Sequence, residues 1–327
     1  MLKLGVCTPA QDVPWSRFWR RGLVSCSLLK TGRPPAREEI ARFERLMKQI
    51  QLSNGVSRTT FRGRFAACNE EIQKSLEEVF PPGPARLDVA DWAVSNGITA
   101  MEWFERLRQS YPAVEFTASD RTLYLIEARL PATGETYILE PDGTPVQYVR
   151  DPFVLSLTQP VRWVYWVNRR LWRRAWSDWR NRWSGELRLP PGWNGLEEDG
   201  MTAEAPPFVL HKLPLAHPEV LHLMAHCEQF HIRRHSIFDA LPRPVDIIRS
   251  MNIFNRAYFS EDALEQGARA VWRSLRPGGI WIAGRTVQEN PARHEATIYR
   301  RRQRGWEIRK RIGGGSETEA AALRVTA

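Results

Sequence analysis

The stretch that decides the fold runs from Arg86 to Asp120 and reads RLDVADWAVSNGITAMEWFERLRQSYPAVEFTASD. Its first segment, residues 87–90, predicts a short buried strand that begins after the breaker cluster PPGP at residues 81–84. Gly97 lies in a turn, where a positive φ would let a ligand approach the backbone closely. The stretch therefore opens as a strand followed by a loop that is suited to ligand binding.

The second half of this stretch completes the pattern. Residues 98–107 have the apolar spacing of a helix, and residues 114–118 alternate as a second strand that leads to Asp120. An acid at this place in a βαβ unit accepts hydrogen bonds from ribose hydroxyls. The loop contains no GxGxxG, so the fingerprint gives no support for a dinucleotide. We expect the first half of a nucleotide-type βαβ unit.

A second informative segment lies far downstream, from Val245 to Thr286. It contains a fourth strand, an Asn-containing loop, Tyr-Phe at 258–259, a helix, the turn RPGG and a fifth strand. Together with AVSNG at 93–97 and ASD at 118–120, it resembles the catalytic domain of the class I S-adenosylmethionine-dependent methyltransferases. Within that class the chain is most similar to the chemotaxis-receptor (CheR-type) methyltransferases.

The resemblance implies an α/β class I methyltransferase (Rossmann-like) fold, with a seven-stranded sheet and a closing antiparallel hairpin. We expect an N-terminal arm and covering helices in residues 1–80, the methyltransferase domain in residues 81–312 and a flexible tail in residues 313–327. An insertion at about 122–207 interrupts this domain. Its Asp-Gly turn between apolar runs predicts a β-hairpin, and a Trp/Arg-rich helix follows.

The resemblance also implies which residues hold the cofactor, S-adenosyl-L-methionine. Asp120 is expected on the ribose, Ser236 near the adenine amino group, and Asp91 near the methionine ammonium. Tyr258 and Arg249 are the expected catalytic residues: the tyrosine lies near the transferred methyl in the family, and an arginine can orient a carboxylate acceptor. The expected cofactor-binding set is Asp91, Ala93, Ser95, Asn96, Gly97, Thr99, Asp120, Ser236 and Asn252.

These features predict methyl transfer to an acceptor that the sequence does not identify: a small molecule, a lipid headgroup or a protein carboxylate. The residue types of this loop match those of the receptor methyltransferases, so their roles are expected to carry over. The interval from Asn252 to Tyr258 differs, so the identity of the substrate does not carry over. Methyl transfer needs positioning and exclusion of water rather than covalent help. Ala90 and Trp92 are expected at positions where other methyltransferases have glycine. The alternative is therefore a non-catalytic relative that uses the fold as a scaffold and docks to an anionic membrane or a nucleic acid through the Trp/Arg-rich helix.

Composition narrows the class of protein. The chain has 327 residues, 43% of them hydrophobic, which is ample for a folded core. Its net charge of +10 favours anionic partners, either nucleic acid or an anionic membrane surface. The four cysteines form no CxxC pair, which argues against disulfides and a zinc knuckle and favours a reducing cytoplasm. We expect no metal, no membrane span and no signal peptide.

The segment 161–183, VRWVYWVNRRLWRRAWSDWRNRW, is rich in tryptophan and arginine. Three interpretations stay open: a helix whose tryptophan face packs on the domain, an interfacial helix on an anionic membrane, or a nucleic-acid-binding helix. In the second, the helix from Trp163 to Trp183 would hold a cytoplasmic protein at the inner face of the membrane. The tryptophans at helical spacing are Trp172, Trp176, Trp179 and Trp183.

Overall fold

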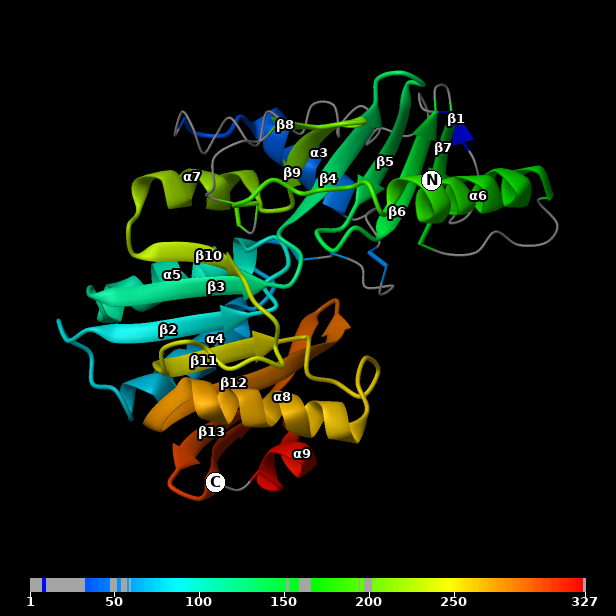
Figure 1. Cartoon of the computed structure of the whole chain (residues 1–327). Helices are drawn as coiled ribbons and strands as arrows, with labels where there is room; N and C mark the ends of the chain where they lie inside the picture. Colours follow the sequence, from blue (N-terminus) through cyan, green and yellow to red (C-terminus); the bar gives the residue numbers. More distant parts are fainter. Residues whose placement is uncertain are drawn as a thin grey trace. The chain divides into compact units, whose positions relative to one another are not determined.

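The computed structural model describes residues 8–9, 33–47, 52–53, 58, 60–150, 153–158, 166–193, 195–196 and 202–325. The chain forms two compact units, each with its own seven-stranded sheet (Figure 1). The parallel-sheet unit comprises Thr60–Arg121 and Cys227–Ala327, and the antiparallel unit comprises Met1–Thr59 and Thr122–His226. The inserted segment thus folds together with the N-terminal part of the chain.

The sheet of the parallel-sheet unit has the order β10-β3-β2-β11-β12-β13-β14. Neighbouring strands are parallel from β10 to β12, whereas β13 is antiparallel to both β12 and β14. Counted along this unit the order is 3-2-1-4-5-6-7, a doubly wound Rossmann-like arrangement. The bounds are β2 Leu87–Trp92, β3 Val114–Asp120, β10 Phe230–Arg234, β11 Val245–Met251, β12 Leu275–Glu289, β13 Ala292–Arg302 and β14 Gly305–Ile312.

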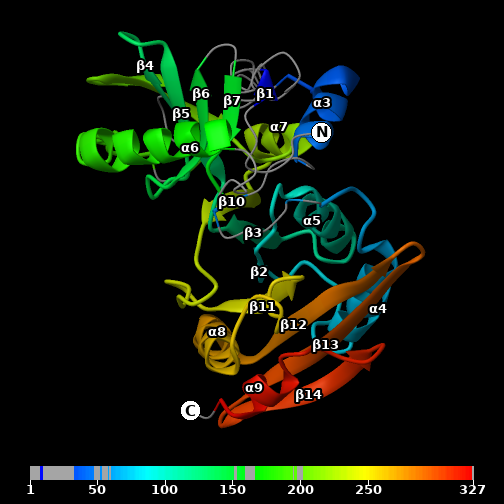
Figure 2. The same ribbon diagram turned by 90° about the vertical axis from the view of Figure 1, so that its right-hand side faces the viewer.

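This topology confirms the expected α/β fold, including the seven-stranded sheet and the closing hairpin of β13 and β14. The helices α4 (Ala66–Glu77) and α5 (Ile98–Ser110) lie on one face of the sheet, and α8 (Glu261–Ser274) lies on the other (Figure 2). The start of α8 is fixed by Ser260, whose hydroxyl accepts a hydrogen bond from the Ala263 amide at 3.3 Å.

A large aromatic core lies on the α8 face of the sheet. Trp281 stacks on Tyr299 with ring centroids 4.8 Å apart and contacts Trp306 at 5.3 Å. The Trp281 indole donates to the Ser250 hydroxyl at 2.9 Å, so this buried polar group is paired. Gly267 allows α8 to pack closely against the Phe254 ring, because a Cβ at this position would lie only 2.2 Å from that ring. Close packing therefore fixes α8 against the sheet.

Residues 313–325, expected as a flexible tail, instead complete this core. They include α9 (Glu319–Leu323), which packs on α8 and buries Ala321, Ala322 and Val325. The Thr318 hydroxyl also lies 3.2 Å from the Tyr299 hydroxyl. The sequence signal was weak because the buried residues are small and carry little apolar periodicity. The end of the described chain is therefore part of the fold.

The antiparallel unit is a sheet of order β1-β7-β6-β5-β4-β9-β8, and every neighbouring pair is antiparallel. The expected hairpin is present as β5 and β6, and Gly143 at its turn has φ +83°. The insertion is nevertheless larger than a hairpin and a helix, since it extends to His226 rather than to about residue 207 and supplies six strands of this sheet. Their bounds are β4 Tyr124–Leu130, β5 Glu135–Leu139, β6 Pro145–Arg150, β7 Phe153–Ser156, β8 Thr202–Ala205 and β9 Phe208–Pro214, with β1 at Thr8–Pro9.

Two further helices belong to this unit, α3 (Arg37–Met47) and α7 (Pro218–His226). Phe43 and Met47 of α3 join a buried cluster that also contains Leu125, Ile138 and Leu213 of the antiparallel sheet. Although α3 lies among the covering helices expected in residues 1–80, it is therefore part of the core of the antiparallel unit.

The Trp/Arg-rich segment forms α6 (Trp166–Asp178) and continues as a π-helical turn, Trp179–Trp183. Trp179 is buried against Tyr137 and Phe208, with ring centroids at 5.0 and 6.3 Å. The part of the tryptophan face at Trp179 therefore packs on its own sheet, which agrees with the first interpretation for this residue. Residues 161–165, which include Trp163, lie outside the described part of the chain. None of the described helices is both long and apolar enough to cross a membrane.

The role of α9 can be tested with two substitutions on adjacent residues. Ala322→Asp would bury a carboxylate against α8, so we expect the free energy of unfolding to fall by roughly 2–4 kcal/mol. Leu323→Asp is the matched control, because Leu323 is 54% exposed, and its effect should stay within about 0.5 kcal/mol. Urea denaturation followed by circular dichroism measures both. Equal effects would show that α9 is not docked in solution.

Candidate functional site

The topology defines one place where a ligand is expected. Strand order reverses between β2 and β11, and open α/β sheets bind ligands outside the carboxyl ends of the strands at such a switch point. In the register of the sheet, Trp92 is paired with Ser250 on β11 and with Ser119 on β3. The loop after β2, the end of β3 and the start of the loop after β11 therefore meet at one edge.

The backbone at this edge adopts an unusual conformation. Ala93, Ser95 and Gly97 have φ of 61°, 60° and 81°, and Asn252 after β11 has φ of 61°. Left-handed backbone costs a residue with a Cβ about 1–2 kcal/mol, and such strain concentrates at functional sites. Ala90, which we expected at a glycine position together with Trp92, lies in β2 instead. The positions at which glycine would relieve strain are Ala93 and Ser95.

Hydrogen bonds hold this loop in its curved form. The Ser95 amide donates to Asp120 Oδ2 at 2.8 Å, which joins two predicted cofactor residues. Asn96 is buried and forms a local turn, because its Oδ1 accepts from the Ile98 amide at 3.1 Å. Its Nδ2 also donates to the Thr60 carbonyl at 3.3 Å. The loop is thus preorganised, with the half-buried Asp120 at its side.

Beneath the loop, Asp91 and Arg249 form a buried ion pair. They are paired across β2 and β11, and the Arg249 guanidinium donates to both carboxylate oxygens, with Nε–Oδ1 at 3.1 Å. The same guanidinium donates to Asn69 Oδ1 at 2.9 Å and to the Thr99 carbonyl at 3.1 Å. It also lies 4.1 Å from the centroid of the Trp103 ring. This pair connects two strands with α4 and α5.

This arrangement corrects two predicted roles. Arg249 is only 1% exposed and its donors are directed at Asp91, Asn69 and Thr99, so it is not placed to orient an acceptor carboxylate. Asp91 is buried as well, and its partner is Arg249 rather than a methionine ammonium. Burial raises the pKa of the Asp91 carboxyl, while the Arg249 charge opposes that change. Both residues are engaged in buried contacts that support the loop.

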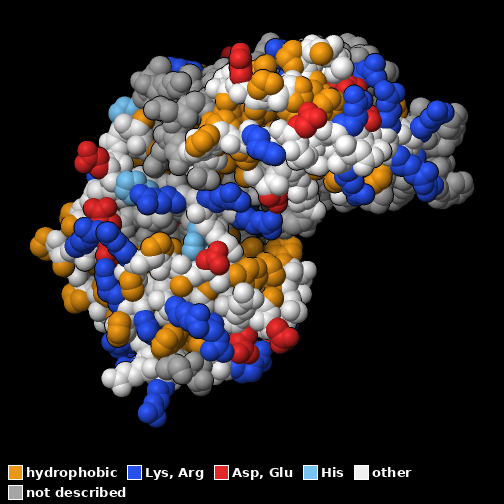
Figure 3. Space-filling model, in the orientation of Figure 1, with side chains coloured by type: hydrophobic (Ala, Val, Ile, Leu, Met, Phe, Trp, Pro, Cys, Tyr) orange, Lys and Arg blue, Asp and Glu red, His pale blue; other side chains and the backbone are white. Residues whose placement is uncertain are grey.

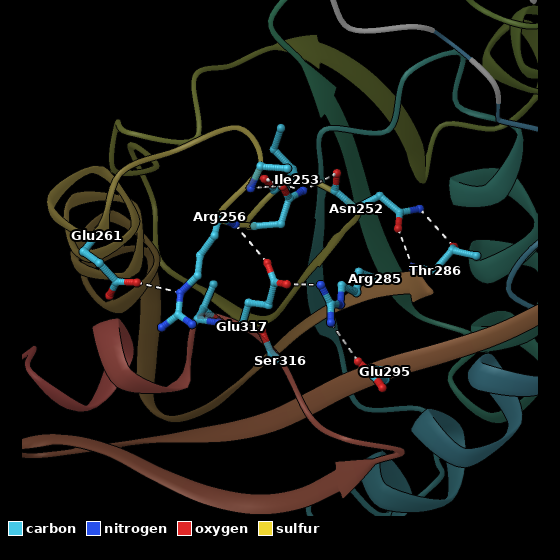
Figure 4. A network of polar contacts seen from close by, with 12 residues as sticks. Asn252, Ile253, Arg256, Glu261, Arg285, Thr286, Glu295, Ser316 and Glu317 are labelled. Atoms are coloured by element: carbon cyan, nitrogen blue, oxygen red, sulfur yellow. Dashed lines mark hydrogen bonds and ion pairs between the residues drawn. The ribbon is translucent and has the colours of Figure 1, made fainter. Parts of the chain in front are cut away.

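Asn252 connects the loop after β11 to β12. Its Oδ1 accepts from the Thr286 amide at 2.6 Å, and its Nδ2 donates to Thr286 Oγ1 at 3.3 Å (Figure 4). In the same region, Glu317 accepts from the Arg256 amide at 2.9 Å and pairs with Arg285. The C-terminal segment therefore helps to fix the loop that carries Tyr258. Neither Thr286 nor Glu317 had a signal in the sequence, because their partners are distant in the chain.

The remaining predicted residues lie at the rim or in the frame of the site. Tyr258 is 50% exposed and its ring contacts Phe259 at 6.4 Å. Ser236 forms its own turn after β10, where its Oγ accepts from the Phe238 amide at 3.3 Å. Thr99 is buried in the first turn of α5 and contributes its carbonyl to Arg249. The structure thus brings together Ser95 with Asp120, and Asp91 with Arg249 and Thr99.

Two aromatic rings that sequence reasoning did not assign lie at the ends of β2 and β10. Trp92 and His235 have ring centroids 4.8 Å apart, and the His235 amide donates to the Asp120 carbonyl at 3.1 Å. Burial lowers the pKa of His235, so the neutral imidazole is favoured at this contact. Among the described residues, no group of three or more His, Cys, Asp or Glu side chains is arranged to hold a metal ion.

Comparison with known proteins gives remote similarities. No family model and no curated protein matches this chain. The chain is similar to PKMT2 from Rickettsia typhi in complex with AdoHcy, with 10% identity, 65% of this chain and 24% of that chain covered, and a TM-score of 0.26. It is also similar to the glycopeptide N-methyltransferase MtfA, with 10% identity, coverage of 70% and 56%, and a TM-score of 0.30.

A third similar structure is the DhpI–SAH complex, with 10% identity, 80% of this chain and 72% of that chain covered, and a TM-score of 0.32. The chain spans about a quarter of the length of PKMT2 and just over half that of MtfA. At TM-scores this low, the strand order of the parallel-sheet unit is what identifies the fold.

The strained loop leads to a prediction on stability. Ala93→Gly removes a Cβ at a position with φ of 61°, so we expect it to raise the free energy of unfolding by up to about 1 kcal/mol. Ala90→Gly is the matched control in β2, where glycine should cost about 1 kcal/mol because it adds backbone entropy to the unfolded chain. Thermal unfolding of both variants tests the difference in sign. Destabilisation by both would contradict the assigned backbone conformation.

The buried ion pair leads to a second prediction. Arg249→Met leaves the Asp91 carboxylate buried without its cation, so the free energy of unfolding should fall by roughly 3–5 kcal/mol. Adding Asp91→Asn removes the unpaired charge and should recover part of this loss. Urea denaturation of the wild type, both single variants and the double variant gives the coupling energy. Additive effects would contradict a direct interaction between these two residues.

Proposed function

We propose that the parallel-sheet unit binds S-adenosyl-L-methionine at the ends of β2, β3 and β11 and transfers its methyl group to an acceptor. The observation that carries this proposal is the bond between the Ser95 amide and Asp120 at the switch point. It joins a loop with left-handed residues, which a ligand can approach closely, to an acid placed at the end of the next strand. That combination suits the ribose end of a nucleoside.

The residues at this edge fit such a cofactor. The Asp120 carboxylate supplies acceptors, and ribose hydroxyls are donors. The loop amides before α5 lie at a helix N-terminus, which favours polar and negatively charged groups of a ligand. Asp91 does not serve the methionine ammonium, because it is committed to Arg249. In this proposal backbone carbonyls of the loop take that role.

Tyr258 is the residue we assign to the acceptor side. It lies exposed on the loop after β11, and the backbone of this loop is fixed at Asn252 and Arg256. The bound cofactor supplies a methyl group on a sulfonium. Transfer of this methyl group to the acceptor atom would leave the electron pair of the broken carbon–sulfur bond on sulfur. The chain's contribution is to hold the acceptor in line and exclude water.

The acceptor class stays open among a small molecule, a lipid headgroup and a protein carboxylate. The CheR-type assignment is also part of the proposal, and it is supported by the order of the AVSNG, ASD and RPGG segments in the folded sheet. Burial of Arg249 weakens the case for a carboxylate acceptor oriented by that residue. An amine acceptor would instead lose a proton to solvent or to a nearby base during transfer.

Calorimetric titration with S-adenosylmethionine and S-adenosylhomocysteine tests the proposed cofactor site. We expect saturable binding to the wild-type chain. Asp120→Ala should weaken it by roughly 10- to 100-fold, because a charged hydrogen-bond acceptor is worth about 1.5–3 kcal/mol. Asp120→Asn keeps an acceptor for the Ser95 amide and should show a smaller loss.

The matched control is Glu115→Ala, which removes a carboxylate from the opposite end of the same strand. It should leave cofactor affinity unchanged. If the wild type binds neither compound, the catalytic proposal fails, and the alternative of a non-catalytic protein that uses the fold as a scaffold becomes the better account. If Asp120→Ala and Glu115→Ala weaken binding equally, the cofactor does not bind at the switch point.

A further inference from the structure

The outward face of α6 and of the π-helical turn that follows it is a basic surface that the proposed function does not use. In Figure 3, Lys and Arg side chains gather over the region where α6 lies in Figure 1. We define this basic face of α6 by its exposed arginines, and it belongs entirely to the antiparallel unit. These residues are Arg170, Arg173, Arg174, Arg180 and Arg182.

The opposite face of the same helix is already occupied. Ala175 and Trp179 are buried, and Trp183 contacts Phe208 of β9 with ring centroids 5.7 Å apart. Two arginines also cover tryptophan rings, since Arg180 lies 5.0 Å from the Trp176 ring centroid and Arg182 lies 5.0 Å from that of Trp183. Trp179 and Trp183 therefore anchor the helical segment on its sheet, and exposed guanidinium groups lie on its solvent side.

Within the described part of the chain, the charge on this face is largely uncompensated. Arg174 pairs with Asp178 at 3.5 Å, but Arg170 and Arg173 have no acidic partner within the described part of the chain. Arginines elsewhere are paired more closely, for example Arg311 with Glu319 at 2.9 Å. Like charges on adjacent turns repel one another, so a stable row of them is suited to an anionic partner. The π-helical turn within this surface is a feature often found at functional sites.

We propose that the basic face of α6 binds the phosphate backbone of a nucleic acid. Helices that lie in a membrane surface turn a broad apolar face toward the lipid. Here the part of that face formed by Ala175, Trp179 and Trp183 is packed against the protein's own sheet. Among residues 169–183, whose exposure the structure describes, Leu171 at 38% is the one large hydrophobic side chain that is substantially exposed. Guanidinium groups at successive helical turns, with little apolar surface among them, are better suited to bind phosphate groups than to insert at the acyl-chain boundary of a lipid layer.

The test uses the full chain and a fluorescein-labelled single-stranded RNA of mixed sequence, with anisotropy measured over a series of salt concentrations. The variant is Arg170→Gln/Arg173→Gln/Arg174→Gln. We expect roughly tenfold or greater loss of RNA affinity near 0.1 M salt and a salt-dependence slope that is smaller by about 2, since each phosphate contact on a single strand contributes about 0.7. Circular dichroism and cofactor calorimetry of the variant should match the wild type.

The matched control is Arg302→Gln/Arg304→Gln/Arg309→Gln, which removes the same formal charge from exposed arginines of β13, β14 and the turn between them. Arg302 and Arg309 both pair with Glu307, so their loss should change RNA binding little. Equal loss in both triple variants would overturn the proposal by showing that binding follows net charge alone. Absence of RNA binding in the wild type would also overturn it.

Sedimentation with phosphatidylglycerol vesicles distinguishes a nucleic-acid partner from a membrane partner. We expect weak, salt-sensitive vesicle binding that Leu171→Gln leaves unchanged. Strong vesicle binding that Leu171→Gln abolishes, together with RNA binding that the α6 variant retains, would contradict the proposal and favour a lipid partner. Because these measurements do not depend on the cofactor site, failure of this proposal is distinguishable from failure of methyl transfer.

Discussion

The ion pair between Asp91 and Arg249 is the interaction on which the candidate site depends. It lies where strand order reverses, and it ties β2 and β11 to α4 and α5 through Asn69 and Thr99. A buried ion pair repays its desolvation only with good geometry and additional hydrogen bonds, and both are present here. The left-handed loop that follows β2 begins two residues after Asp91. The strained loop thus directly follows a strand that this buried ion pair holds in place.

This arrangement explains which parts of the site were visible in the sequence. The nucleotide-type βαβ unit, Asp120 and the fifth strand were predictable because apolar periodicity and local turns report on neighbours in the chain. The pairing of Asp91 with Arg249 was not, since the two residues are 158 positions apart. From their residue types alone, Asp91 and Arg249 were each predicted to contact a ligand. Likewise, the sequence suggested glycine-poor positions at Ala90 and Trp92, but only backbone dihedrals identify Ala93 and Ser95 as the strained ones.

The antiparallel unit shows a different limit of sequence reasoning. Its hairpin was predicted from an Asp-Gly turn, but the complete sheet requires β4 to pair with β9 across an insertion that contains α6. Non-local strand pairing leaves no local signal. The surface on which α3 packs was equally hidden, since it is formed by residues of β4, β5 and β9 that are distant in the sequence. The packing of the last helix was not predicted for a related reason. Ala321 and Ala322 are fully buried, but each contributes little apolar surface, so they produce only a weak hydrophobic pattern in the sequence.

Two surfaces of opposite character therefore belong to the two units. One is a strained loop at the carboxyl ends of parallel strands, beside the carboxylate of Asp120. The other is a row of exposed arginines on a helix that uses its tryptophans for internal packing. A crystal structure of the chain with S-adenosylhomocysteine tests most directly whether the first of these surfaces binds the cofactor. The account predicts electron density over the ends of β2 and β11, with the ribose hydroxyls on Asp120. Density at any other place, with an unchanged empty edge at residues 93–97, would contradict it.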